Sequence, residues 1–573
     1  MSSYFRIFSF TLALLTSAFA PAKGASRPFT APPPVHAVTS RNGMVVAQEA
    51  RAARIGADVL KRGGNAIDAA VAVGFAMAVT YPRAGNLGGG GFMVIHLAKS
   101  NQDIAIDYRE TAPAAATKDM FLNAHGNPDP DKSRNSALGI GVPGTVAGLA
   151  LAERQYGSGV MSLADLIAST IELARNGIPV EDDTADSLPA ARQRLARWPS
   201  SAKIFLKDGK SLAFGAKLIQ SDLADTLQAI ADKGPRAFYE GPIAEKIAGA
   251  VQAAGGIMTA DDLKNFHAVL RVPVRGAYRG YEIVSMPPPS SGGVHLIEML
   301  NILEGYDLAK LGRGEQSLHY FVETMKRAYA DRAEFMGDPE SVRMPLKGLL
   351  SKKYAASLRA TISEKATPAA DIRAGNPQGF EGPNTTHFSV IDREGNAVSN
   401  TYTLNFSYGL GLVADGTGVL LNNELDDFTA KPGAANAYGL VGFDANLPGP
   451  GKRPLSSMTP TIVLKDGKPF LVTGSPGGSR IITAVLQVIA NVIDFHMSIA
   501  DAVTAPRLHH QWLPDEVMME PGFAPEVING LKARGHKVTL VAPGTSANSI
   551  EVTPQGYVGA ADTRTRGALA VGD

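Results

Sequence analysis

The most constraining feature of the sequence is a predicted β-hairpin whose first strand opens on two consecutive threonines. It reads Pro383-Asn384-Thr385-Thr386-His387-Phe388-Ser389-Val390-Ile391-Asp392, turns at residues 393–396 and returns over residues 397–405. Alternating β-branched and aromatic residues around a Gly-Asn turn indicate two paired strands. A threonine pair at the start of a strand is also typical of β-propensity alone. The threonine pair alone therefore does not indicate a catalytic site, and the motifs around it must decide.

Thr385 could act as a nucleophile only after a change in the chain. A free threonine hydroxyl hardly ionises near neutral pH, but a threonine at a chain start can use its own α-amine as the base. That amine has an ordinary pKa of about 7.7–8.0. Thr385 gains it only if the Asn384–Thr385 bond is cut. His387 does not offer a Ser-His type of alternative, because alternate strand residues point to opposite faces and His387 cannot share a face with Thr386.

Further motifs follow in a fixed order: Thr401-Tyr402-Thr403-Leu404-Asn405, Asn422-Asn423-Glu424-Leu425-Asp426-Asp427-Phe428, Lys452-Arg453-Pro454-Leu455-Ser456-Ser457-Met458 and Gly474-Ser475-Pro476-Gly477-Gly478-Ser479-Arg480. With Thr385-Thr386-His387 they resemble the γ-glutamyltranspeptidase (glutathione hydrolase) family, over essentially the whole chain after its leader. The alternation of hairpins and helices predicts a layered α/β body. The resemblance implies its specific form, the N-terminal-nucleophile hydrolase αββα sandwich.

The resemblance also implies an activity. A precursor would cut itself between Asn384 and Thr385 into a large subunit (25–384) and a small subunit (385–573). Thr385 would then attack the γ-glutamyl carbonyl of glutathione or a related donor. The γ-glutamyl-enzyme would pass to water or to amino-acid and peptide acceptors, with ping-pong kinetics. Neither a cofactor nor a metal is required.

Recognition of a γ-glutamyl head needs a cation and hydroxyls for its carboxylate, carboxylates and amides for its ammonium, and backbone N–H groups near the carbonyl. By resemblance, Arg109 pairs with the α-carboxylate, assisted by Ser456 and Ser457. The α-ammonium is held by Asn405, Glu424 and Asp427. The N–H groups of Gly477 and Gly478 form the oxyanion hole, and Thr403 hydrogen-bonds to Thr385. Glu424 stands where some members of the family carry Gln, which would modify head-group affinity.

Each of these residues has a simpler structural explanation when taken alone. Arg109 at a strand end is typical of a surface salt bridge, Asp426-Asp427 of a helix cap, and Ser456-Ser457 and Gly477-Gly478 of turns. Other motifs fail. The GxGxxG match at 139–144 lacks a dinucleotide-binding context and is better explained as a tight strand-to-helix turn. Neither HExxH nor GxSxG occurs, and the adjacent side chains of His509 and His510 diverge, so no metal site is predicted.

The N-terminus predicts export. Arg6 precedes an apolar run at residues 7–15 and an Ala18-Phe19-Ala20 cleavage site, with Gly24 as a rival point of cleavage. Residues 1–24 are therefore expected to be a signal peptide and the mature protein to be periplasmic or secreted, with no membrane anchor. The chain of 573 residues has no cysteine, which excludes disulfides and Cys-based zinc sites. Lys+Arg 55 against Asp+Glu 54 gives no global field for nucleic acid, so a small molecule is the expected partner.

Two other functions stay open. A cephalosporin (glutaryl) acylase of the same fold is the enzymatic alternative, and a non-catalytic exported amino-acid-binding protein is the other. The Gly/Pro-rich stretch 432–450 around Tyr438 resembles the lid loop of family members that close over glutathione-like donors. That favours the transpeptidase.

The remaining pattern predicts where elements lie. Helices are expected at 48–61, from an Asn65 cap to Val79, and at 295–304 and 479–494, with strands at 92–95 and 104–108 and a second hairpin at 461–472. The second of these strands would deliver Arg109. Residues 371–383 have the composition of a flexible exposed segment, as a chain to be cut beside Thr385 requires.

Overall fold

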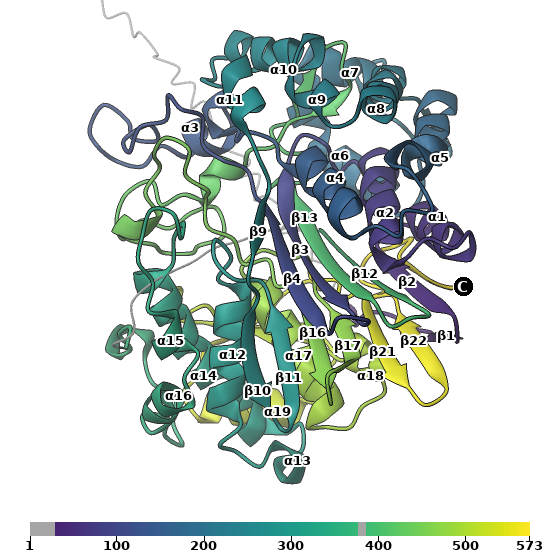
Figure 1. Ribbon diagram of the computed structural model, residues 1–573. Coiled ribbons are helices and arrows are strands. Elements are labelled where there is room, and N and C mark those ends of the chain that lie inside the picture. Colours follow the sequence, from purple (N-terminus) through teal and green to yellow (C-terminus); the bar gives the residue numbers. More distant parts are fainter. Residues whose placement is uncertain (1–28, 376–385) are drawn as a thin grey trace, which may run out of the picture.

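The computed structural model describes residues 29–375 and 386–573. Within these residues, two seven-stranded antiparallel sheets stack face to face between helical layers (Figure 1). Sheet A has the order β1 (Val38–Ser40), β22 (Gly556–Ala560), β21 (Ser549–Thr553), β17 (Lys468–Thr473), β16 (Thr461–Lys465), β11 (Tyr281–Ser285) and β10 (Val274–Tyr278). Sheet B has the order β23 (Leu569–Gly572), β2 (Gly43–Ala47), β12 (Thr386–Asp392), β13 (Ala397–Thr403), β3 (Gly90–Leu97), β4 (Gln102–Tyr108) and β9 (Val269–Arg271). The predicted layered α/β body is confirmed.

Helices cover the outer face of each sheet. On the side of sheet B, α1 (Ala50–Lys61), α2 (Ala66–Thr80) and α4 (Thr145–Tyr156) pack against its strands. The helices α5 (Leu163–Asn176), α8 (Ser221–Lys233) and α10 (Pro242–Ala253) extend the same apolar cluster farther from the sheet. Those over sheet A include α12 (Gly292–Leu303), α14 (Glu315–Phe335), α17 (Arg480–Ile493), α18 (Ile499–Thr504) and α19 (Pro525–Ala533). Further helices are α3 (Pro130–Arg134), α6 (Asp182–Ala196), α7 (Pro199–Phe205), α9 (Arg236–Tyr239), α11 (Ala260–Asn265), α13 (Leu308–Leu311), α15 (Leu346–Leu349) and α16 (Lys352–Arg359). Short strands form small separate sheets: β5 (Ile178–Pro179) with β8 (Lys217–Leu218), β6 (Leu206–Lys207) with β7 (Lys210–Ser211), β14 (Val413–Ala414) with β15 (Val419–Leu420), and β18 (Leu508–His509) with β19 (Val517–Met519) and β20 (Val538–Leu540).

Three apolar layers hold these elements together. One lies between the sheets, where Phe92 and Val94 of sheet B and Ile462 and Val472 of sheet A are buried. The other two lie between each sheet and its helices. Alternate side chains of one strand therefore enter different layers, and both faces of each central strand are dry.

The predicted central hairpin is present as β12 and β13, paired from Thr386↔Tyr402 to Ile391↔Ala397. Gly395, at φ +86°, supplies the left-handed turn residue. Asp392 ends β12, and its carboxylate accepts from the Ala66 N–H at 2.8 Å. This contact ties the hairpin to the N-terminus of α2, where a carboxylate is favoured.

The capped helix is also confirmed. Asn65 accepts from the Asp68 N–H while the Asp68 carboxylate accepts from the Asn65 N–H, which is a complete capping box. Every residue of α2 is buried, as its all-round apolar pattern predicts. Gly74 lets the helix pack closely on α4, because a Cβ there would lie 2.9 Å from Leu149. The other predicted helices and strands lie within one to three residues of their expected bounds.

The 139–144 stretch is a turn, as expected, but a strand does not precede it. A 3-10 helix (Ala137–Gly139) and an isolated bridge from Val142 to Thr111 lead into α4. A Cβ at Gly144 would lie 2.0 Å from the Tyr108 carbonyl oxygen, so glycine is required for packing against β4.

Three predictions lie partly or wholly outside the described residues. The leader at 1–24 and the Asn384–Thr385 cleavage site do so entirely, and the predicted flexible segment 371–383 is described only to residue 375. None of the helices in residues 29–375 and 386–573 combines the length and the hydropathy of a membrane-spanning segment.

Candidate active site

The site is built around the first residue of β12. Thr386 donates its hydroxyl to the side-chain oxygen of Gln48, from the end of β2. Asn384 and Thr385, the predicted cleavage pair and nucleophile, lie outside the described residues. Because Thr385 is joined to Thr386 by one peptide bond, the position of Thr386 marks the part of the fold where the predicted nucleophile is attached.

Thr386 and His387 face opposite sides of the sheet, as predicted. The His387 imidazole is buried between the sheets, 3.0 Å from Thr401 Oγ1 and 3.0 Å from Ser389 Oγ. Burial lowers its pKa to about 3, so the ring is neutral near pH 7. His387 therefore has a packing role and is turned away from the side that carries the Thr386 hydroxyl.

The Thr386 side of the hairpin opens on a cavity of about 900 Å³. Its lining residues include Gln48, Thr386, Thr403, Asn405, Tyr438, Gly477, Arg480 and Thr545. Four of the predicted site residues thus share one cavity with Thr386. Six others (Arg109, Glu424, Asp427, Ser456, Ser457 and Gly478) are buried beside it without lining it.

Thr403, Asn405 and Tyr438 are linked by hydrogen bonds. Thr403 Oγ1 accepts from the Asn405 N–H at 2.7 Å, and Asn405 has φ +69°. The Asn405 side chain donates to the Asn423 carbonyl at 2.8 Å and accepts from the Tyr438 hydroxyl at 2.9 Å. The 432–450 stretch, predicted to be a lid, is thereby attached to the end of β13.

Arg109 lies at the end of β4 and is completely buried. Its guanidinium donates to Glu424, to Asp427 at 2.5 Å and to the Pro454 carbonyl at 2.9 Å, and Glu110 lies 3.8 Å away. The sequence prediction assigned Arg109 and the two carboxylates to opposite ends of a ligand head. The structure instead brings them into direct contact.

One guanidinium faces three buried carboxyl groups in this cluster. Burial raises the pKa of Glu110 to about 8, and burial together with mutual repulsion raises the pKa of Glu424 and Asp427, against the attraction of Arg109. Among the described residues, Glu424 Oε2, Asp427 Oδ1 and both Glu110 oxygens accept no hydrogen bond. A ligand ammonium would supply hydrogen-bond donors to these unmatched buried acceptors, and its positive charge would favour the ionised form of the carboxyl groups.

Ser456 and Ser457 continue the same loop. Pro454 and Leu455 give their carbonyls to Arg109, while Ser457 Oγ accepts from the buried Arg332 at 2.7 Å. The Ser456 hydroxyl accepts from the Met458 N–H at 3.2 Å. The loop therefore carries two hydroxyls and contacts two buried guanidinium groups, those of Arg109 and Arg332, which are the kinds of donor that a carboxylate needs.

Gly477 and Gly478 form the turn into α17. Their φ angles are +133° and +67°, and a Cβ at Gly477 would lie 2.5 Å from Thr545 Cγ2. Neither N–H donates a hydrogen bond to any other residue that the structure describes. Backbone N–H groups at a helix N-terminus can stabilise negative charge, and the oxyanion role of these two residues stays a prediction.

A family model described as γ-glutamyltranspeptidase matches residues 52–572. The chain belongs to the γ-glutamyltranspeptidase family. It is 52% identical over 541 residues to the glutathione hydrolase proenzyme of Escherichia coli (strain K12), covering 94% of this chain and 93% of that protein.

Two solved structures support the same assignment. Cephalosporin acylase from Bacillus halodurans is 27% identical with a TM-score of 0.84, over 97% of this chain and 99% of that one. Helicobacter pylori γ-glutamyltranspeptidase is 46% identical with a TM-score of 0.55, over 56% of this chain and 93% of that one. The αββα body is therefore the N-terminal-nucleophile hydrolase sandwich of this γ-glutamyltranspeptidase family member.

Sequence reasoning missed several residues of the site in this family member. Gln48 contacts Thr386 across 338 positions of chain, so no local pattern reveals the pair. Glu110 was not assigned to the site although it follows Arg109 directly, because a charged pair at a strand end normally lies at the surface. Arg332 sits inside an ordinary amphipathic pattern on α14, and only its burial distinguishes it.

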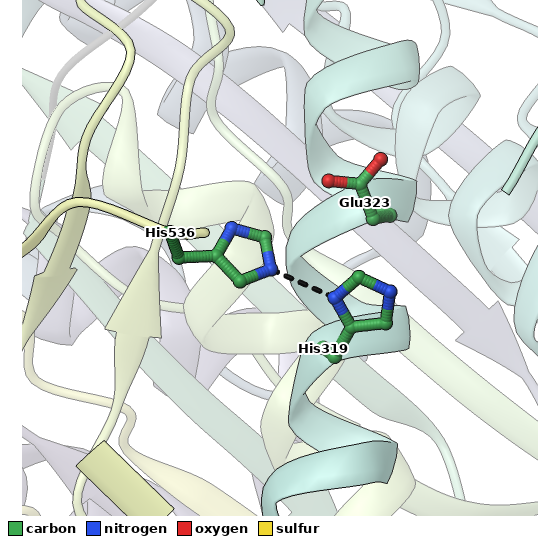
Figure 2. Close-up of side chains that lie close together, drawn as sticks. All are labelled: His319, Glu323 and His536. Atoms are coloured by element: carbon green, nitrogen blue, oxygen red, sulfur yellow. Dashed lines mark hydrogen bonds between the residues drawn. The ribbon is translucent and has the colours of Figure 1, made fainter. Parts of the chain in front are cut away.

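Among the described residues, one group of metal-ligating side chains lies close together, away from the predicted site residues. The group consists of His319 and Glu323 on α14 and His536 before β20, and one potential ligand atom of each lies within 4.8 Å of the other two (Figure 2). The imidazoles hydrogen-bond to each other at 2.8 Å, and Glu323 accepts from Lys326 at 2.9 Å and from Arg327 at 2.7 Å. The Glu323 carboxylate is therefore already paired with two cations, and the hydrogen bond between the two imidazoles connects α14 to the segment before β20.

Proposed function

We propose that the chain is an exported, self-processing γ-glutamyltransferase and glutathione hydrolase. The observation that carries the proposal is that Thr386, Thr403 and Gly477 line one cavity. Beside it lies the buried Arg109 cluster, in which one carboxyl oxygen on each of Glu424 and Asp427 lacks a donor among the described residues and could accept from an ammonium. Thr385, one peptide bond before Thr386, is the nucleophile. Residues 1–24 are the signal peptide, 25–384 the large subunit and 385–573 the small subunit.

The precursor cuts itself in two steps. Thr385 Oγ attacks the carbonyl carbon of Asn384, its proton passes to the departing amide nitrogen, and the C–N bond breaks as an ester forms. Water then hydrolyses the ester, which gives a carboxylate on Asn384 and restores the Thr385 hydroxyl. The freed α-amine of Thr385 is the base that an internal threonine lacks.

The mature enzyme repeats this chemistry on its donor. The α-amine accepts the Thr385 hydroxyl proton as Oγ attacks the γ-carbonyl, and the proton then goes to the leaving amine. The N–H groups of Gly477 and Gly478 stabilise the oxyanion, and Thr403 orients the Thr385 oxygen. The γ-glutamyl ester next reacts with water or with the amine of an acceptor, which releases Thr385 for another cycle.

The donor's head group is held by groups already present in the structure. Its ammonium fits the unmatched oxygens of Glu424 and Asp427, with Asn405 beside them. Its carboxylate fits the guanidinium of Arg109 and the hydroxyls of Ser456 and Ser457. When the donor binds, some of the contacts of Arg109 with Glu424 and Asp427 are replaced by contacts of these side chains with the ligand's carboxylate and ammonium.

A cephalosporin acylase is the second candidate, because the Bacillus halodurans acylase shares the fold with a TM-score of 0.84. The discriminating experiment compares γ-glutamyl-p-nitroanilide with a glutaryl-cephalosporin as substrates of one preparation. A glutaryl group lacks the α-ammonium for which the Glu424–Asp427 cluster has unmatched acceptors. We expect turnover of the anilide, with a γ-glutamyl adduct on the smaller chain, and slow turnover of the cephalosporin. The reverse preference would support the acylase.

A further inference from the structure

Arg480 is a cation on the cavity wall that the mechanism above leaves unused. It is the first residue of α17, it is partly exposed, and it lines the cavity together with Gly477, Ser479 and Thr545. Among the described residues, its guanidinium has neither a hydrogen-bond acceptor nor an ion-pair partner. Burial lowers its pKa, which the more distant Glu520 only partly opposes. The charge is thus uncompensated.

The other arginines on the cavity wall are engaged. Arg83 pairs with Asp183 at 2.6 Å, and Arg564 pairs with Glu520 at 2.6 Å. Arg194 donates to the carbonyls of Ser407 at 2.9 Å and Gly409 at 3.2 Å, and it stacks over Phe406. Of the four arginines in the described lining, Arg480 alone has its donors unused.

The local structure accommodates this cation at some cost. Positive charge is disfavoured at a helix N-terminus, where the macrodipole is already positive. Glycine at position 544 makes room for the guanidinium, because a Cβ there would lie 2.5 Å from Arg480 Nη2. A cation, a helix N-terminus and an open glycine backbone together favour an anion, and guanidinium binds a carboxylate with two parallel hydrogen bonds.

We propose that Arg480 binds the carboxylate at the far end of the leaving group, which is the glycine carboxylate of a glutathione-type donor, and the same carboxylate of a dipeptide acceptor. The inference rests on the proposed function, which assigns the γ-glutamyl head to the Arg109 cluster. The rest of the donor then occupies the remaining cavity and brings one carboxylate with it. Arg480 would be a specificity-determining residue, since the reaction itself does not require it.

The test compares donors that differ only in that carboxylate. Glutathione and its C-terminal amide are assayed with the wild type and with Arg480→Gln, and kcat/KM is measured for each. We expect the preference of the wild type for glutathione over the amide to be roughly 10–100-fold, as the loss of one charge-assisted pair would predict. Arg480→Gln should remove this preference by lowering kcat/KM for glutathione alone. Arg480→Lys should restore part of it.

Two controls and one further assay, on acceptors, complete the test. Arg194→Gln removes the other arginine without an acidic partner and should leave the glutathione-to-amide ratio unchanged. γ-Glutamyl-p-nitroanilide has no carboxylate in its leaving group, so Arg480→Gln should turn it over at close to the wild-type rate. Glycylglycine should lose its advantage over glycylglycinamide as an acceptor in the same variant.

The outcomes separate this inference from the proposed function. If the wild type does not turn over the anilide, the proposed function is wrong. If the anilide is turned over but the wild type treats glutathione and its amide alike, the assignment of Arg480 is overturned, even where the variants fail to fold. An equal loss on both donors in Arg480→Gln, or a selective loss in Arg194→Gln, would overturn it too.

Discussion

The Tyr438 hydroxyl donates to the Asn405 side-chain oxygen at 2.9 Å, which joins the 432–450 stretch to the residue that follows Thr403 by two positions. The ring of Tyr438 also packs edge-on against Phe406, with centroids 6.0 Å apart. A contact between a surface stretch and the end of the central hairpin can close the cavity over a bound donor.

Tyr438→Phe should weaken donor binding and largely spare chemistry. Losing one hydrogen bond costs about 0.5–1.5 kcal/mol, so KM for γ-glutamyl-p-nitroanilide should rise by about 2–12-fold while kcat changes little. Steady-state kinetics measure both constants. Tyr557→Phe, on β22 and outside the cavity lining, is the matched control. A fall in kcat with an unchanged KM would contradict a binding role.

Arg109 should be indispensable for stability, and Glu424 should not. Removing a cation from a fully buried cluster leaves Glu424 and Asp427 uncompensated, which costs about 3–5 kcal/mol. Glu424→Gln removes one of the competing negative charges and should change the free energy of unfolding by less than about 1 kcal/mol. Thermal unfolding of Arg109→Leu and Glu424→Gln, each in a Thr385→Ala background that keeps one chain, measures the difference. Equal Tm values would refute the cluster's role.

Gly477→Ala should lower kcat. A side chain at φ +133° is strained, and its Cβ would lie 2.5 Å from Thr545, so the turn that presents the oxyanion donors must move. Loss of one such donor costs about 10²–10³ in kcat, measured with the anilide. Gly209→Ala is the control for left-handed backbone alone, since nothing lies near its Cβ position. An unaffected kcat in Gly477→Ala would exclude this turn from catalysis.

Acid should destabilise the protein through its buried histidines. Burial lowers the pKa of His536 to about 3 in the folded chain, below the value of about 6.5 expected when unfolded. Below about pH 6.5 the unfolded chain binds the proton and the folded chain does not, so stability is complete above pH 6.5 and is lost as pH falls towards 3. His536→Gln should reduce this slope by up to about 1.4 kcal/mol per pH unit.

Denaturant unfolding at pH 7 and pH 5 measures the effect, with the exposed His125→Gln as control. Glutamine is chosen because its amide can donate a hydrogen bond to His319 in place of the His536 imidazole shown in Figure 2. An unchanged slope in His536→Gln would show that His536 does not titrate as its burial requires.

Local patterns were sufficient for much of the fold. The capping box at Asn65 and the hairpin turn at Gly395 follow from contacts within a few residues, so the sequence alone predicts them. The order of strands in the sheets does not follow in this way. β2 pairs with β12 more than 300 residues later, and only the complete fold decides that register.

The site likewise contains residues that the motifs predict and contacts that they do not. Thr403, Asn405 and Gly477 were predicted from motifs, and the structure places all three on one cavity. The direct contact of Arg109 with Glu424 was not predicted, because a motif gives residue types but not the distances between them. Arg480 lies in the motif at residues 474–480 and was given no role there, because what distinguishes it is that no partner for its guanidinium is found among the residues described.

Self-cleavage is tested by the intact mass of the purified protein beside that of Thr385→Ala. We expect two chains in the wild type, the smaller beginning at Thr385, and one uncut chain in the variant. A wild type that stays whole after long incubation would lack the α-amine base, and it would contradict the proposed mechanism in favour of a non-catalytic amino-acid-binding protein.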